Sequence, residues 1–179
     1  RGQGILATFH YVPLHSAPHA RELGVDVVMP VTDRVAATLL RLPLHPRLAR
    51  MVLVARERGQ AWLGCLLAAL LEDRDVLRGR PDDLPTDVGL RLALLDDPTH
   101  QHPQADGRAL RRARDRAHDL ARRVGIVPGG ADPAEAGLLL ASAYPDRIAQ
   151  ARGGRGRYVL RAGTEGWLGL ATRQLDPHK

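Results

Sequence analysis

Apolar residues repeat with helical spacing over two consecutive segments near the middle of the chain. The first, 46–58, is expected to begin at Pro46, because proline is tolerated in the first turn of a helix, where its missing N–H is not needed. One buried face, with spacing i, i+3, i+4 and i+7, consists of Leu48, Met51, Val52 and Ala55. After Gly59 the second segment, 60–73, is apolar on nearly all sides. Such a helix is buried on several sides, so this segment is predicted to be the centre of the core.

Three more helices are predicted downstream from their end signals. A short helix begins at Thr86 or Asp87, either of which can act as its N-cap. Residues 108–124 form a strongly amphipathic helix with a narrow apolar stripe. A further helix begins with Asp132 as its N-cap, followed by a proline and an acidic residue, and ends near Tyr144. Together these segments predict a helical bundle.

The pattern changes from helical to strand-like toward the end of the chain. Asp146 is expected to cap one more helical turn, which includes Ile148 and Ala149. Residues 158–162 then alternate as a strand does, and 167–171 are expected to form a returning strand. The predicted fold class is therefore mainly α, a helical bundle followed by the start of a small β module. We divide the chain into a poorly assigned segment 1–41, a helical domain 42–151, and the start of a truncated β module, 152–179.

Composition adds a preference for anionic partners. The chain has 179 residues and 26 Lys+Arg against 20 Asp+Glu, a net charge of +6, and nearly all of the basic residues are arginine. Guanidinium groups match the geometry of phosphate, although a GC-rich genome would enrich arginine, alanine, glycine and leucine together. The single cysteine, Cys65, excludes an internal disulfide and fits a reducing compartment. The apolar run 61–71 is too short to span a bilayer, so we expect a cytoplasmic protein without a membrane partner, and a piece of something longer.

Catalytic and metal-binding motifs are missing from the sequence. It has no G-x-x-x-x-G-K-[ST] phosphate loop, no helicase-type acidic box and no arginine-finger motif. The histidines His10, His15 and His19 invite a metal-dependent hydrolase as a distant alternative, but no cysteine or carboxylate shares their spacing. We therefore assign no catalytic, cofactor-binding or metal-binding residue, and we expect the chain alone not to hydrolyse ATP.

Two arginine-rich segments are candidates for phosphate contacts. On the helix 108–124, seven arginines face two aspartates, and the favoured interpretation is a solvated face with pairs such as Asp119 to Arg123. The better candidate is a set of arginines with a neighbouring ring, because glycines let backbone N–H groups approach a phosphate and a ring can stack on a base. That set is Arg147, Arg152, Arg155, Arg157 and Tyr158. Its alternative is a flexible linker between the helical and β modules.

Three motifs resemble a known family. "LPLHPRLARM" at 42–51, "CLLAALLEDRD" at 65–75 and "GLLLASAYPDRIAQARGGRGRYVL" at 137–160 are similar to the region that follows the motor domains in HrpB-type ATP-dependent helicases of the DEAH/RHA group. The resemblance covers roughly 39–162. Segment 1–41 matches it only in short pieces and is interpreted as a remnant of the family's winged-helix module.

The resemblance implies a ratchet-like, helicase-associated domain that binds single-stranded RNA or DNA beside the motor domains of a parent helicase. ATP and magnesium would belong to those motor domains, which this sequence does not contain. The alternative is a stand-alone helical interaction module that binds an acidic protein partner. Salt-dependent binding separates these two hypotheses.

Overall fold

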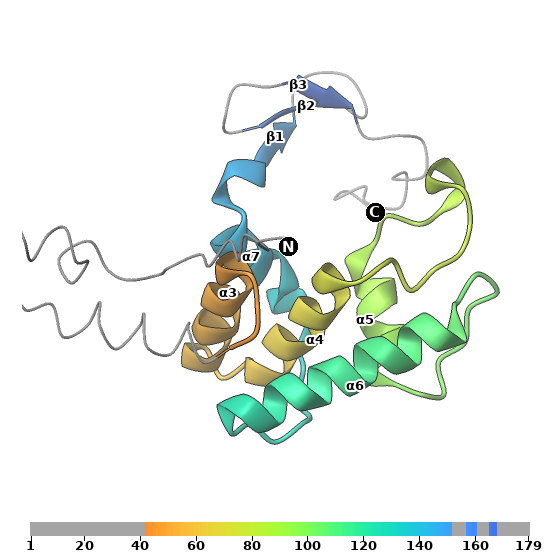
Figure 1. The fold of residues 1–179 in the computed structure, drawn as a ribbon. Helices are drawn as coiled ribbons and strands as arrows, with labels where there is room; N and C mark the ends of the chain where they lie inside the picture. Colours follow the sequence, from red (N-terminus) through yellow and green to blue (C-terminus); the bar gives the residue numbers. More distant parts are fainter. Residues whose placement is uncertain (1–41, 152–156, 161–164, 168–179) are drawn as a thin grey trace, which may run out of the picture. The chain divides into compact units, whose positions relative to one another are not determined.

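The computed structural model describes residues 42–151, 157–160 and 165–167. Contacts divide the chain into two units, 1–43 and 44–179, and the described helices and strands lie in the second (Figure 1). The predictions for 1–41, including the histidines His10, His15 and His19, lie outside the described residues. The described part is mainly α with a small antiparallel sheet, which confirms the predicted fold class.

Five α-helices are present in the described part of the chain. They are α3 (Pro46–Glu57), α4 (Ala61–Glu72), α5 (Val88–Asp96), α6 (Gly107–Val124) and α7 (Ala136–Ala143). Single 3-10 turns lie between some of them: η2 (Pro81–Asp83), η3 (Pro133–Glu135) and η4 (Pro145–Arg147). Each α-helix lies where the apolar spacing predicts it, with ends that differ by one or a few residues.

Side-chain caps explain where several of these helices begin. The carboxylates of Asp87 and Asp106 accept hydrogen bonds from backbone N–H groups in the first turns of α5 and α6. Asp132 caps η3, so the predicted helix start is confirmed as a cap, although its first turn is a 3-10 turn. At α3 the ring of His45 accepts a hydrogen bond from the backbone N–H of Arg47. Its role is therefore to orient the backbone.

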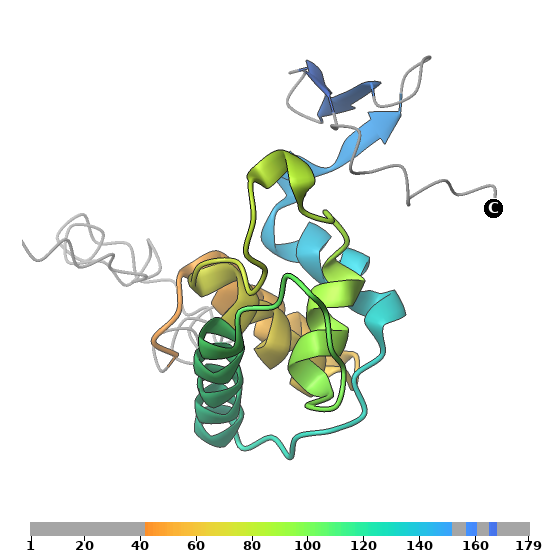
Figure 2. The ribbon, with the colours of Figure 1, turned by 90° about the vertical axis from the view of Figure 1, so that its right-hand side faces the viewer.

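Helix α4 lies at the centre of the bundle. It packs against α3, α5, α6 and α7, and Figures 1 and 2 show it between α3 and α6. Leu63, Leu66 and Leu67 are at most 1% exposed. The indole N–H of Trp62 donates to the carboxylate of Asp96 at the end of α5, at 2.7 Å. The prediction that the most apolar segment forms the core is thus confirmed.

Helices α3 and α4 lie very close together at Gly64. A Cβ atom added there would lie 2.6 Å from the Cβ of Ala55 and 3.3 Å from the Cα of Val52. The second neighbour is backbone, so α3 cannot yield by a change of side-chain rotamer alone. The absence of a side chain at Gly64 is what allows the two helices to pack at this distance.

Ion pairs connect the two ends of α3 to the region of α7. The Arg47 guanidinium lies 2.8 Å from the Asp146 carboxylate and 5.4 Å from the centre of the Tyr144 ring. At the other end of α3, Arg58 pairs with Glu135 at 2.8 Å. Two of the motifs that carry the family resemblance, around 42–51 and 137–160, therefore meet in space.

The sheet contains three antiparallel strands in the order β1-β2-β3. They are β1 (Ala149–Ala151), β2 (Arg157–Leu160) and β3 (Glu165–Trp167). The prediction that Asp146 caps a helical turn with Ile148 and Ala149 is wrong. Asp146 lies inside η4, whose N-cap is Tyr144, while Ile148 is extended and Ala149 pairs with Leu160. The returning strand also begins earlier than predicted, and residues 168–171 lie outside the described residues.

Cys65 is expected to be unreactive until the helices unfold. Its side chain is fully buried in α4, and this burial raises the pKa of the thiol to about 12. Because the thiolate is the reactive form, Ellman's reagent should label the native protein very slowly and one thiol per chain after denaturation. Rapid labelling of the native protein would contradict the buried position.

Candidate nucleic-acid interface

Of the five predicted site residues, Arg147, Arg157 and Tyr158 belong to the described part of the chain, in η4 and β2. Arg147 ends η4, and its side chain is 75% exposed, with its Nε 3.7 Å from the neighbouring Asp146 carboxylate. Tyr158 lies in β2, is partly exposed, and pairs with Ala151 in β1. Arg157 begins β2, while Arg152 and Arg155 lie outside the described residues.

The Arg/Gly stretch, by which we mean residues 152–157, follows β1 directly and ends with the first residue of β2. Its flanking residues belong to β1 and β2, which form one antiparallel ladder. The sheet thus begins before the stretch, three residues ahead of the predicted boundary at residue 152. The stretch joins strands of one sheet and does not join a helix to the first strand. Tyr158 therefore belongs to β2, and Arg152 and Arg155 lie in the sequence between β2 and its partner strand β1.

Most arginines of α6 face a partner within the protein. Arg112 pairs with Asp73 at 3.0 Å, and Arg116 pairs with Glu72 at 2.7 Å, so both connect α6 to the end of α4. Arg114 donates to the backbone carbonyls of Leu94 and Leu95, which satisfies acceptors at the end of α5.

At the C-terminal end of α6, Arg122 and Arg123 both form ion pairs with Asp119. Arg123 lies 2.8 Å from its carboxylate and Arg122 lies 3.4 Å away. The hydrogen bond from Arg123 is the main reason why the pKa of Asp119 is lowered. The predicted pair of Asp119 and Arg123 is confirmed. Among the described residues, only Arg108 and Arg111 of α6 lack a hydrogen-bonded or ion-paired partner for their guanidinium groups.

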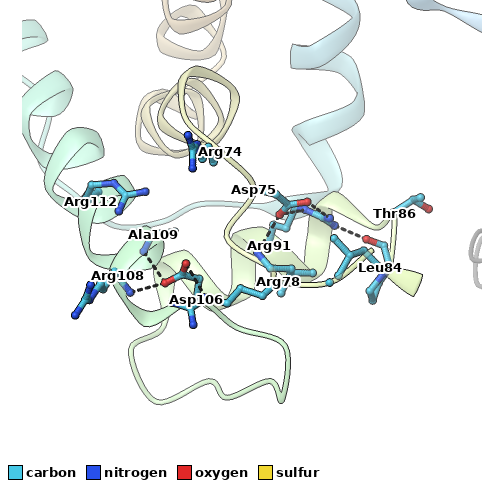
Figure 3. Close-up of a pocket in the computed structure, with 13 residues that line it drawn as sticks. Arg74, Asp75, Arg78, Leu84, Thr86, Arg91, Asp106, Arg108, Ala109 and Arg112 are labelled. Atoms are coloured by element: carbon cyan, nitrogen blue, oxygen red, sulfur yellow. Dashed lines mark hydrogen bonds and ion pairs between the residues drawn. The ribbon is translucent and has the colours of Figure 1, made fainter. Parts of the chain in front are cut away.

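A second group of arginines lines a groove that the sequence did not predict. The groove has a volume of about 760 Å³ and lies between the segment 74–86, Arg91 of α5 and the first turn of α6 (Figure 3). Its arginines are Arg74, Arg78, Arg91, Arg108 and Arg112, and its acidic lining residues are Asp75 and Asp106. We call this feature the arginine groove.

Backbone contacts hold the two walls of the arginine groove together. Leu77 and Ala105 form an isolated antiparallel bridge. Next to it, the N–H of Arg78 donates to the carbonyl of Gln104 at 2.7 Å, and the N–H of Asp106 donates to the carbonyl of Val76 at 2.8 Å. The arginines come from segments far apart in the sequence, and no spacing rule predicts this bridge. The sequence therefore does not predict that these arginines lie close together.

The arginines of the groove differ in how strongly they are held. Arg91 donates to Asp75 at 2.9 Å and to the carbonyl oxygens of Pro85 and Asp87. All three of its guanidinium nitrogens therefore make hydrogen bonds within the protein. Arg78 pairs with Asp106 at 2.8 Å but remains 66% exposed. The Arg74 and Arg108 guanidinium groups have no hydrogen-bonded or ion-paired partner among the described residues, although the charge of Arg74 helps to lower the pKa of Asp73. Figure 3 shows both at the wall near Arg112.

Acidification is expected to weaken the fold partly through Asp106. The Arg78 guanidinium is the main cause that holds the pKa of this carboxyl well below its usual range. A carboxyl whose pKa is lower in the folded state than in the unfolded state stabilises the fold when the pH is above its unfolded-state pKa, which is about 4 for aspartate. This stabilisation is lost as the pH falls from there through the folded-state pKa.

In Asp106→Asn the amide still caps α6, but the ion pair with Arg78 is removed. We therefore expect the variant to be less stable at neutral pH and to lose less stability on acidification. Urea midpoints measured between about pH 7 and pH 3 test this. Parallel curves for the variant and the original chain would contradict the role of the pair.

The described residues contain no group of three or more histidine, cysteine, aspartate or glutamate side chains that could hold a metal ion. Within the same residues, no helix is both long enough and apolar enough to cross a membrane.

Comparison with known proteins finds solved structures that are similar to this chain. No protein-family model and no curated protein sequence matches the chain. The crystal structure of the DEAH/RHA helicase HrpB from Escherichia coli is similar to it, with a TM-score of 0.54 and 27% identity over 83% of this chain. A crystal structure of the E. coli DExH-box NTPase HrpB gives a TM-score of 0.50 and 26% identity over 80%. The chain spans 18% of the length of each of those proteins. The resemblance seen in the sequence motifs is thereby confirmed: the chain is related to the HrpB-type DEAH/RHA helicases.

Proposed function

We propose that this chain is an accessory region of an ATP-dependent helicase and binds single-stranded nucleic acid, RNA or DNA, beside the motor domains. The observation that carries the proposal is the similarity to the DEAH/RHA helicase HrpB over 83% of this chain. ATP and magnesium would act in the motor domains, and a cytoplasmic location is part of the proposal. The chain's own task is to hold the strand while the motor domains use ATP.

The contacts proposed for the strand are electrostatic and aromatic. The chain has a net charge of +6, and the arginines of the Arg/Gly stretch lie next to Tyr158 in sequence. Arginine donates two parallel hydrogen bonds to a phosphate, and the tyrosine ring offers a face on which a base can stack. Because neither contact reads the edge of a base, the proposed binding is largely independent of sequence.

Direct binding measurements separate this proposal from an acidic protein partner. Fluorescence anisotropy with labelled oligo(U) and oligo(dT) is compared with labelled polyglutamate of the same charge. We expect the oligonucleotides to bind more tightly, because phosphates match the guanidinium fork and only nucleotides offer bases to Tyr158. Equal or tighter binding of polyglutamate would favour the interaction module and contradict the proposed function.

A further inference from the structure

The arginine groove combines a cavity with more positive than negative side chains. Five arginines and two aspartates line about 760 Å³, which is within the usual size of a ligand site. Asp73, which pairs with Arg112 from the neighbouring surface, adds a third carboxylate. Even when it is counted, the arginines outnumber the acidic groups by two, and the carboxylates are all engaged in pairs with arginines.

The helix N-terminus does not itself supply donors to the groove. The Asp106 carboxylate already accepts the backbone N–H groups of Arg108 and Ala109 at 2.9 and 3.2 Å. A ligand must therefore be bound by the guanidinium groups. Arg74 and Arg108 supply them, since neither guanidinium has a hydrogen-bonded or ion-paired partner among the described residues.

Two further arginines can take part without loss of the fold. Arg78 and Arg112 are 66% and 55% exposed and hold their carboxylates through single short contacts. Exposed ion pairs of this kind contribute little to stability, and each occupies only one short contact, so a more highly charged anion can bind the remaining N–H groups of these arginines. Arg91 is excluded, because its donors are committed to Asp75 and to backbone carbonyls.

We propose that the arginine groove is a phosphate-binding site in which Arg74 and Arg108, assisted by Arg78 and Arg112, bind a phosphate group. The phosphate comes from the single-stranded nucleic acid of the proposed function, and in that form the inference rests on that function. A free polyphosphate presents the same chemistry. This site lies on different elements from the Arg/Gly stretch, so it adds a second point of contact.

A pair of matched variants tests the groove. Arg74→Ala/Arg108→Ala removes the two groove arginines that make no hydrogen bond or ion pair through their guanidinium groups within the described residues, and Arg50→Ala/Arg56→Ala removes two exposed charges from α3. Far-UV circular dichroism and thermal melting verify that both variants fold. Binding of oligo(U) and of inorganic tripolyphosphate is then measured for each.

Each phosphate contact to a single strand contributes roughly 0.7 log units of affinity at about 0.1 M salt relative to about 1 M salt. The groove variant removes two such contacts, so we expect it to lose about 25-fold in oligo(U) affinity at about 0.1 M salt. It should also lose most of its tripolyphosphate binding, while the α3 variant keeps both. Equal loss in the two variants would overturn the groove site and leave the proposed function standing. Groove-dependent tripolyphosphate binding without oligonucleotide binding would support the site and contradict the proposed function. Binding of neither probe by the original chain would overturn both.

Discussion

Replacing Gly64 with leucine is expected to unfold the helical bundle or leave it only marginally stable. Even the Cβ of an alanine would lie 2.6 Å from the Cβ of Ala55 and 3.3 Å from the backbone of Val52. Overpacking in a core costs about 1 to 3 kcal/mol, and a leucine adds three more carbons in the same contact. The total stability of a domain of this size is only about 5 to 15 kcal/mol.

Gly64→Ala is the milder variant, and we expect it to remain folded so that its free energy of unfolding can be measured. Alanine gains about 1 kcal/mol over glycine from helix propensity, so the sign of the measured change shows whether the clash outweighs that gain. Subtracting that gain from an overpacking cost of about 1 to 3 kcal/mol, we expect a net loss of about 0 to 2 kcal/mol.

Gly137→Ala is the control, because nothing lies within 4 Å of a Cβ atom at that exposed position of α7. It should be as stable as the original chain or up to about 1 kcal/mol more stable. Urea denaturation followed by circular dichroism measures all three variants. If Gly64→Ala were as stable as Gly137→Ala, the close packing of α3 on α4 would be refuted.

Charge reversal of the Arg/Gly stretch is expected to have the largest effect on binding. In Arg152→Glu/Arg155→Glu/Arg157→Glu, three proposed phosphate contacts are removed, which at about 0.1 M salt corresponds to roughly a hundredfold loss from counterion release alone. The new carboxylates repel the strand in addition, so binding should fall below detection. The slope of log affinity against log salt should become shallower by about 2 if residual binding is measurable.

The control for this variant is Arg50→Glu/Arg56→Glu on α3, whose arginines are exposed and lie outside the proposed contacts. It changes the net charge in the same direction and should keep the salt slope of the original chain. If the triple variant bound oligo(U) as well as this control does, the Arg/Gly stretch would serve only to connect β1 and β2.

The sequence predicted the helices well because their ends are marked locally. Asp87 and Asp132 each cap a turn that the sequence assigned to them, and Gly125 ends α6 in the left-handed conformation that favours glycine. The central position of α4 was also predictable, since a helix that is apolar on nearly all sides must be buried on several sides.

Features that depend on distant pairing were missed for a physical reason. Strand β1 consists of Ala149, Gln150 and Ala151, all exposed and without strand propensity, so only its ladder with β2 makes it a strand. The arginine groove likewise depends on the bridge between Leu77 and Ala105. Neither contact leaves a periodic signal in the sequence.

The salt dependence of single-strand binding by the unmodified chain tests the central claim most directly. Anisotropy titrations of labelled oligo(U) at a series of salt concentrations should give a straight line of log affinity against log salt, with a slope of about −0.7 for each phosphate neutralised. Contacts from the Arg/Gly stretch and the arginine groove together predict a slope of about −3 or steeper. No binding at low salt, or an affinity that does not change with salt, would contradict the account.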